Sequence, residues 1–160
     1  MEEDNHLPLY GVGPFLVAPV IVISVVCLIL TAYNWIPKYE ITSLDWLLII
    51  LGILIVIYGI VFWISAVRSD IDDNIMENKL KTTGVYGLVR HPIYAAFLYV
   101  SIGLILISCN IYLFFLPVLY WIFLSVMIKS TEEKWLIDLY GDDYLNYSKQ
   151  VNRFFPKLVK

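Results

Sequence analysis

Three long stretches of this chain contain no Asp, Glu, Lys or Arg, and they restrict what it can fold into. They run from Asn5 to Pro37, from Trp46 to Val67 and from Pro92 to Ile128. A charged side chain at the centre of a bilayer costs about 2.5–3.5 kcal/mol, so uncharged stretches of this length indicate helices that span a membrane. Only 16% of all residues are charged and 60% are apolar. The sequence therefore predicts an all-α integral membrane protein.

The third uncharged stretch is too long for one span. As a single helix it would measure about 55 Å, nearly twice the thickness of the hydrocarbon core. Ser108, Cys109 and Asn110 are its turn-like residues, so we expect a helical hairpin there. We predict one domain, residues 1–160, with four transmembrane helices and a C-terminal interfacial helix. The spans are expected at about 14–35, 46–67, 92–108 and 111–128.

The basic residues predict the orientation of the chain. With four spans, the N-terminus, the loop 68–91 and the tail 129–160 lie on one side of the membrane. That side carries every one of the 11 Lys and Arg residues except Lys38. Because basic residues collect on the cytoplasmic side, we expect both termini to be cytoplasmic.

Small residues and a glycine break mark two further features. Gly52 and Gly59 lie seven positions apart, hence on one face of the second span, where small residues let a neighbouring helix approach closely. In the tail, Gly141 is expected to interrupt the helix. The aromatic residues that follow, among them Tyr144 and Tyr147, fit a segment that lies along the membrane interface.

Polar residues gather around the stretch GVYGLVRHPIY, Gly84 to Tyr94. Arg90 and His91 come directly before the predicted hairpin, and the carboxylates Glu132 and Glu133 come directly after it. If the hairpin folds back on itself, both groups return to the same membrane surface. A cation, an imidazole, tyrosines and two carboxylates would then face one another, which suits a small charged cofactor meeting a lipid-soluble substrate.

Each of these residues also has a plain structural explanation. Arg90 alone fits a lipid-phosphate anchor, the tyrosines fit an interfacial aromatic belt, and the glutamates fit the start of a helix. Their combination around one hairpin favours the functional explanation. Cys27 and Cys109 are isolated and give no metal-ligand spacing, so no metal is expected. No long basic patch is present, so no nucleic acid is expected either.

Three blocks in the second half of the chain carry a resemblance to a known family. They are GVYGLVRHPIY, the Glu132–Glu133 pair, and LYGDDYLNYSKQVNRFFP near the end. In this order they resemble the isoprenylcysteine carboxyl methyltransferases and, more broadly, the membrane methyltransferases that include the phospholipid methyltransferases. The similarity extends over residues 78–156. Members are integral membrane enzymes that use S-adenosyl-L-methionine to methylate the carboxylate of a prenylated cysteine.

The resemblance implies a cofactor site and a lipidic or prenylated substrate, with membrane lipids around the protein. Arg90 and Lys129 are the expected catalytic residues. The family has an arginine four residues before the first glutamate, where this chain has Ile128, so Lys129 is the nearest cation. The expected cofactor-binding residues are Asn78, Lys79, Leu80, Lys81, Tyr86, His91, Pro92, Ile93, Tyr94, Glu132 and Glu133.

Isoprenylcysteine carboxylate is the leading candidate for the methyl acceptor, with a phospholipid-type or other lipid acceptor as an alternative. The membrane sterol and isoprenoid reductases share a similar C-terminal block and use NADPH. A dinucleotide, however, needs more cationic contacts than the loop 68–91 provides. A non-catalytic four-helix membrane protein is the third alternative.

Overall fold

The computed structural model describes residues 13–37, 44–72 and 80–157. Within these ranges the chain is helical and no strand forms, apart from an isolated parallel bridge between Val89 and Asn152. The elements are α1 (Gly13–Ala32), α2 (Asp45–Asp72), α3 (Val85–Leu88), α4 (Pro92–Ile107), the short 3-10 helix η1 (Ile111–Leu113), α5 (Leu116–Ser130), α6 (Glu132–Tyr140) and α7 (Asp142–Gln150).

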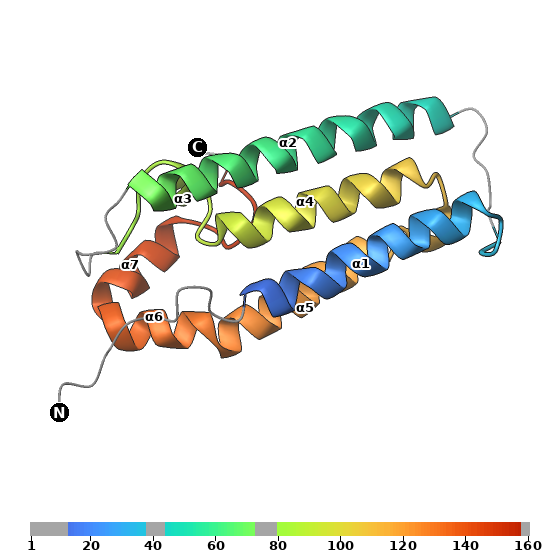
Figure 1. Cartoon of the computed structure of the whole chain (residues 1–160). Helices are drawn as coiled ribbons and strands as arrows, with labels where there is room; N and C mark the ends of the chain where they lie inside the picture. Colours follow the sequence, from blue (N-terminus) through green and yellow to red (C-terminus); the bar gives the residue numbers. More distant parts are fainter. Residues whose placement is uncertain (1–12, 38–43, 73–79, 158–160) are drawn as a thin grey trace.

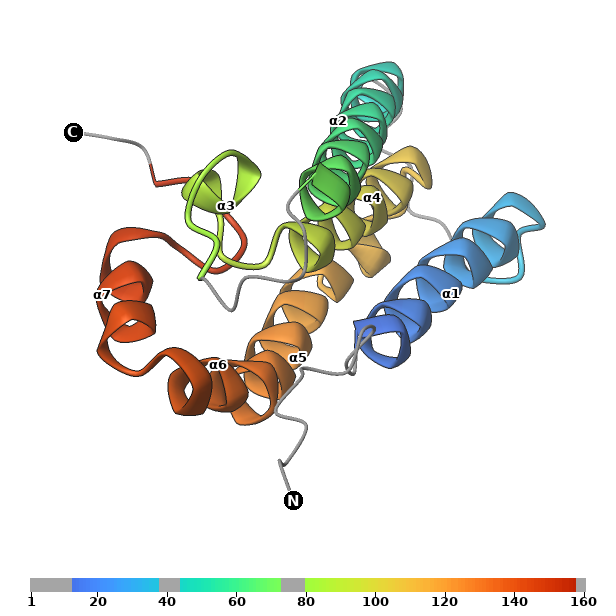
Figure 2. The ribbon, with the colours of Figure 1, turned by 60° about the vertical axis from the view of Figure 1, so that its left-hand side comes forward.

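Four long helices lie lengthwise beside one another and alternate in direction along the chain (Figure 1). The short helices α3, α6 and α7 gather at one end of this bundle, where α2 and α5 end and α4 begins (Figure 2). The hairpin between α4 and α5 lies at the opposite end. The fold therefore brings the loop before α4 and the segment after α5 to the same end, as the sequence predicts.

Three helical runs in the described part of the chain are long and apolar enough to cross a membrane: Gly13–Ala32, Asp45–Ser69 and Ile111–Tyr140. The fourth apolar helix, Pro92–Ile107, has 16 residues and falls short of that length. Many large apolar side chains point outward, such as Leu54, which is 57% exposed. The prediction of an all-helical membrane protein is confirmed, with three helices of spanning length and one shorter apolar helix.

The helices α2 and α4 pack with their backbones in contact. A Cβ atom built on Gly52 would lie 2.7 Å from the carbonyl oxygen of Gly103, and one on Gly59 would lie 2.9 Å from that of Ala96. Real Cβ atoms do not come this close to a carbonyl oxygen, so no other residue fits without a shift. The predicted role of Gly52 and Gly59 in close helix approach is confirmed.

Asn110 fixes the hairpin at the far end of the bundle. Its side chain is completely buried and donates to the carbonyl oxygen of Pro37 at 3.2 Å and to the Thr31 hydroxyl at 3.5 Å. Its Oδ1 atom accepts from the backbone N–H of Tyr112. The turn between α4 and α5 is thereby attached to the end of α1.

The chain after α5 turns back over the opposite end of the bundle. Gly141, at φ 54°, separates α6 from α7 as predicted, because side chains rarely adopt that backbone conformation. After α7 the segment Val151–Phe155 returns to the loop before α4. The N–H of Arg90 donates to the Asn152 carbonyl at 2.9 Å, and that of His91 donates to the Arg153 carbonyl at 3.2 Å. The tail is therefore part of the same structure as the loop that it covers.

Candidate functional site

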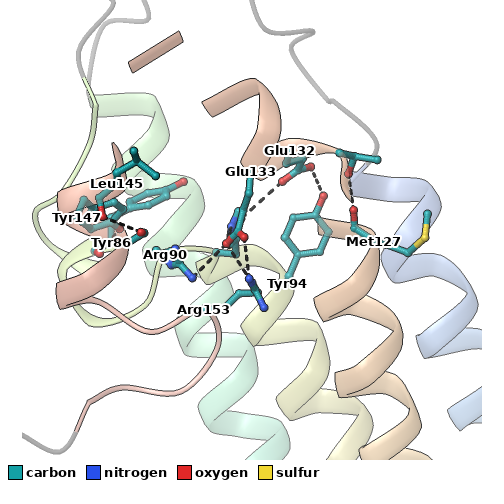
Figure 3. Close-up of polar contacts among 12 residues, drawn as sticks. Tyr86, Arg90, Tyr94, Met127, Glu132, Glu133, Leu145, Tyr147 and Arg153 are labelled. Atoms are coloured by element: carbon teal, nitrogen blue, oxygen red, sulfur yellow. Dashed lines mark hydrogen bonds and ion pairs between the residues drawn. The ribbon is translucent and has the colours of Figure 1, made fainter. Parts of the chain in front are cut away.

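The polar groups predicted to meet do meet, at the end of the bundle that carries the short helices. They come from the loop residues Arg90 and His91, from the first turn of α4 and from the first turn of α6. Figure 3 shows the Arg90 and Arg153 side chains pointing toward Glu133, and the Tyr94 hydroxyl pointing toward Glu132. Pro92 begins α4, a position that suits proline because the first helical N–H groups have no partner within the helix.

Glu133 is the centre of the cluster. Its side chain is buried and accepts two hydrogen bonds from Arg153, Nε to Oε1 at 3.0 Å and Nη2 to Oε2 at 2.7 Å (Figure 3). Arg90 Nη2 lies 3.2 Å from Oε1 of the same carboxylate. A buried carboxylate loses its hydration, and two guanidinium groups compensate for that loss here.

His91 lies between the two carboxylates. Its Nδ1 atom is 3.6 Å from Oε2 of Glu132, and its Nε2 atom is 3.5 Å from Oε1 of Glu133. The imidazole is buried. The Tyr94 hydroxyl donates to Oε1 of Glu132 and so joins the first turns of α4 and α6 (Figure 3). His91, Tyr94, Glu132 and Glu133 thus form one connected network.

Tyr86 belongs to a neighbouring part of this end. Its carbonyl oxygen accepts from the Tyr147 hydroxyl at 2.5 Å, and the Lys81 ammonium lies 5.3 Å from the centre of its ring. Lys81 also donates to the carbonyl oxygen of Ser69, at the end of α2. These contacts join α3 to α7 and the loop before α3 to α2.

The two buried tyrosines of α7 lie beside the cations of the cluster. The Arg90 guanidinium lies 5.9 Å from the centre of the Tyr144 ring. Burial raises the pKa of Tyr147 to about 12, against a smaller lowering by Arg90. Burial, followed by the negative charge of Glu133, also raises the pKa of Tyr144 above its usual range. Both phenols therefore remain neutral hydrogen-bonding groups at physiological pH.

The structure places the remaining predicted residues as follows. Pro92 is buried, and Leu80 and Ile93 are partly buried. Asn78 and Lys79 lie outside the described residues. On α5 the fully buried side chain four positions before Glu132 is Ile128, whereas Lys129 is exposed. The structure therefore brings Arg90, but not Lys129, into the cluster.

Arg153 is the member of the cluster that sequence reasoning did not place there. In the sequence it is one of several basic residues in the tail, 20 positions after Glu133. No short-range sequence pattern predicts a contact between residues so far apart in the chain. The available signals are its place within the block LYGDDYLNYSKQVNRFFP and its position directly before Phe154, which is buried.

The cluster offers both charge types and unused hydrogen-bonding capacity. Arg90 Nε is buried and has no hydrogen-bond partner within the described part of the chain, whereas His91 Nε2 and the Tyr144 hydroxyl, also buried, lie beside Glu133. Buried polar atoms are nearly always hydrogen-bonded, so an unpartnered one indicates a place for a polar ligand. Carboxylates suit an ammonium or ribose hydroxyls, tyrosine rings suit a sulfonium cation, and guanidinium groups suit a carboxylate.

The fold and the cluster define a class: helical membrane proteins with a charged, partly unsatisfied site at one end of an apolar bundle. The family model described as phospholipid methyltransferase matches residues 41–143, which include α2, the loop before α4, the hairpin and α6. The chain belongs to this family of membrane methyltransferases. The predicted resemblance is confirmed.

Individual relatives agree with the family. A protein-S-isoprenylcysteine O-methyltransferase of Xenopus laevis is 32% identical over 126 residues, which cover 73% of this chain and 43% of that protein. Protein-S-isoprenylcysteine O-methyltransferase B of Arabidopsis thaliana is 37% identical over 49% of this chain and 40% of its own length. Methanethiol S-methyltransferase 1 of Bradyrhizobium diazoefficiens is 33% identical over 49% of this chain and 26% of its own length. The chain thus spans less than half the length of these relatives.

Proposed function

We propose that this chain is an integral membrane methyltransferase that uses S-adenosyl-L-methionine to methylate a lipidic or prenylated acceptor. The observation that carries the proposal is the network of Arg90, His91, Tyr94, Glu132 and Glu133 at one end of the apolar bundle. Its residue types and its place in the chain match the blocks that indicate the family. Isoprenylcysteine carboxylate is the leading candidate for the acceptor, because several relatives are named for that reaction.

When bound, the cofactor supplies an electrophilic methyl group on a sulfonium. Glu132 would bind its ammonium or ribose hydroxyls, and the Tyr86 and Tyr94 rings would face the sulfonium. Arg90 and His91 would bind the carboxylate of the cofactor. Glu133 and the segments 78–81 and 92–93 would contact other parts of the cofactor. The chain's contribution to the reaction is to hold the reactants in line and to exclude water.

We further propose four spans with both termini cytoplasmic, because a polar cofactor then reaches the site from the cytoplasm. An acceptor with an apolar tail would arrive sideways from the bilayer. The close α2–α4 contact at Gly52 and Gly59 opposes entry between those two helices.

A second candidate is methyl transfer to an uncharged acceptor such as a thiol, an amine or a phenol. Two observations favour it. The side chain four positions before Glu132 is the buried Ile128, and Lys129 is exposed on another face of α5. One relative is named for transfer to a thiol. An apolar side chain at this place binds a carboxylate less well than the two-pronged arginine of the prenylcysteine enzymes.

Methyl transfer by the purified protein in detergent separates the two candidates. The acceptors are a farnesylated cysteine analogue with a free carboxylate, a thiol with an apolar tail such as farnesyl thiol, and a lipid amine. Transfer to the carboxylate alone supports the leading candidate, and transfer to the thiol or amine alone supports the second. Transfer to none of these acceptors would contradict the proposed function.

Two variants test which side chain of the protein binds the methyl acceptor. If Lys129 holds a carboxylate, Lys129→Ala abolishes transfer to it, whereas Lys149→Ala, an exposed lysine on α7, leaves it unchanged. If the acceptor is uncharged, Ile128→Arg gains activity on the carboxylate that the wild type lacks.

A further inference from the structure

We propose that Arg153 is a positioning residue for the cofactor site, delivered to it by the chain segment that follows α7. The inference rests on the proposed function, and it adds to the site a residue beyond the match of the family model, residues 41–143, but within the block LYGDDYLNYSKQVNRFFP that carries the resemblance. Within the described residues the Arg153 side chain hydrogen-bonds to Glu133 and to none of Glu132, Arg90 and His91, to which we assign the cofactor's charged groups. It acts on them through Glu133.

The segment around Arg153 is attached on both sides. The Asn152 carbonyl accepts from the N–H of Arg90 at 2.9 Å, and the Phe154 carbonyl accepts from the Tyr99 hydroxyl at 2.5 Å. The carbonyl of Arg153 itself accepts from the N–H of His91 at 3.2 Å. Three consecutive carbonyl groups therefore dock the segment on the loop before α4 and on α4 itself.

Side-chain burial fixes the segment further. Phe154 is 2% exposed and belongs to the same apolar core as Tyr99. The ring of Phe155 lies 5.9 Å from that of Tyr99. With Phe154 inserted into the core next to it, Arg153 has little freedom and projects toward Glu133 (Figure 3).

The position of Glu133 in turn affects Arg90 and His91, the two side chains proposed to bind the carboxylate of the cofactor. Both of its oxygens are bound by Arg153, at 3.0 and 2.7 Å. Oε1 then lies 3.2 Å from Arg90 and 3.5 Å from His91 Nε2. The other ring nitrogen of His91, Nδ1, lies 3.6 Å from Oε2 of Glu132. A rotation of Glu133 would shift the imidazole and the Arg90 guanidinium together.

Arginine suits this task better than lysine. Its planar guanidinium meets a carboxylate with two parallel hydrogen bonds, which fix direction as well as distance, whereas an ammonium acts as a point charge. Arg153→Lys keeps the charge and loses the two-pronged geometry. A residue needed only for its charge would tolerate this change, and a positioning residue would not.

The test measures the Kd for tritiated S-adenosyl-L-methionine in detergent-purified full-length protein, together with the midpoint of thermal unfolding. We expect Arg153→Gln to raise the Kd about tenfold or more, the size of effect seen when the partner of a ligand-holding group is removed. Arg153→Lys should raise it by a smaller factor while the unfolding midpoint stays near that of the wild type. Lys157→Gln is the matched control, since it removes one charge from the same segment at an exposed site.

A double-mutant cycle shows whether the effect passes through Glu133. If it does, Glu133→Gln with Arg153→Gln weakens binding little more than Glu133→Gln alone. Equal Kd values in Arg153→Gln, Arg153→Lys and a wild type that binds the cofactor would overturn this inference alone. A wild type that binds no S-adenosyl-L-methionine would overturn the proposed function and the inference with it. If Arg153→Gln fails to fold, Arg153→Lys and Tyr99→Phe, which loosens the docked segment, decide the matter on the same measurement.

Discussion

The Tyr94 hydroxyl donates a hydrogen bond to Glu132, 38 positions further along the chain. This contact joins the first turn of α4 to the first turn of α6 and closes the helical hairpin between them. It therefore connects the fold of the apolar helices directly to the charged site. A change on either side should affect ligand binding more than it affects folding.

Glu132→Gln tests that expectation. The substitution keeps the size of the side chain and its ability to accept from Tyr94, and it removes the negative charge. We expect S-adenosyl-L-methionine binding to weaken by about 1–3 kcal/mol, the usual range for a hydrogen bond to a charged group. Isothermal titration of the purified protein measures the loss, and Asp138→Asn, an exposed carboxylate on α6, is the control. Equal losses in both variants would remove Glu132 from the site.

The packing of α2 on α4 gives a prediction about stability. Gly59→Leu places a side chain where even a Cβ atom lies 2.9 Å from the carbonyl oxygen of Ala96. We expect a loss of about 1–3 kcal/mol or more from overpacking, seen as a lower midpoint of thermal unfolding in detergent. Leu54→Phe adds volume to the same helix on an exposed face and should leave the midpoint unchanged. A stable Gly59→Leu variant would show that the two helices do not touch there.

Asn110 tests the other end of the bundle. Asn110→Ala leaves the Pro37 carbonyl and the Tyr112 N–H without this partner, so we expect a loss of about 1–3 kcal/mol in the free energy of unfolding. Because the cluster lies at the opposite end, the Kd for S-adenosyl-L-methionine should not change. Tyr112→Phe is the control, since its ring is 57% exposed. A large loss of affinity in Asn110→Ala would mean that the two ends are coupled.

Tyr147 gives a prediction about pH. Its pKa in the folded protein is about 12, above the usual value of about 10 in the unfolded chain, because the phenol is buried. The folded state therefore holds the proton more tightly, and this contribution to stability is complete below pH 10 and is lost between about pH 10 and 12. Unfolding midpoints measured across this interval should fall less steeply in Tyr147→Phe than in the wild type. Identical slopes would contradict the buried position.

The orientation in the membrane is tested by cysteine labelling. In a variant without Cys27 and Cys109, single cysteines at positions 38 and 149 should react with an impermeant reagent from opposite sides of sealed vesicles. Reaction of both from the same side would contradict the four-span topology.

The helical fold and the two halves of the charged cluster were predictable because their signals are local. The uncharged stretches, the turn-like residues Ser108 to Asn110 and the break at Gly141 are each recognised from consecutive residues. The contact of Arg153 with Glu133 was not predictable, because it depends on where Phe154 is buried and on backbone pairing with a distant loop. Lys129, expected as a catalytic residue, lies outside the cluster for a reason that helix geometry already contains: one position along a helix, about 100° of rotation, separates the buried Ile128 from the exposed Lys129.

The identity of the ligand is the point on which the rest depends. Purified wild-type protein in detergent is incubated with tritiated S-adenosyl-L-methionine, and unlabelled S-adenosyl-L-methionine or NADPH is added as competitor, with the Glu132→Gln, His91→Ala double variant alongside. We predict saturable binding in the wild type. Unlabelled S-adenosyl-L-methionine should displace the label and NADPH should not, and the double variant should not bind it. Displacement by NADPH, or unchanged binding in the double variant, would contradict it.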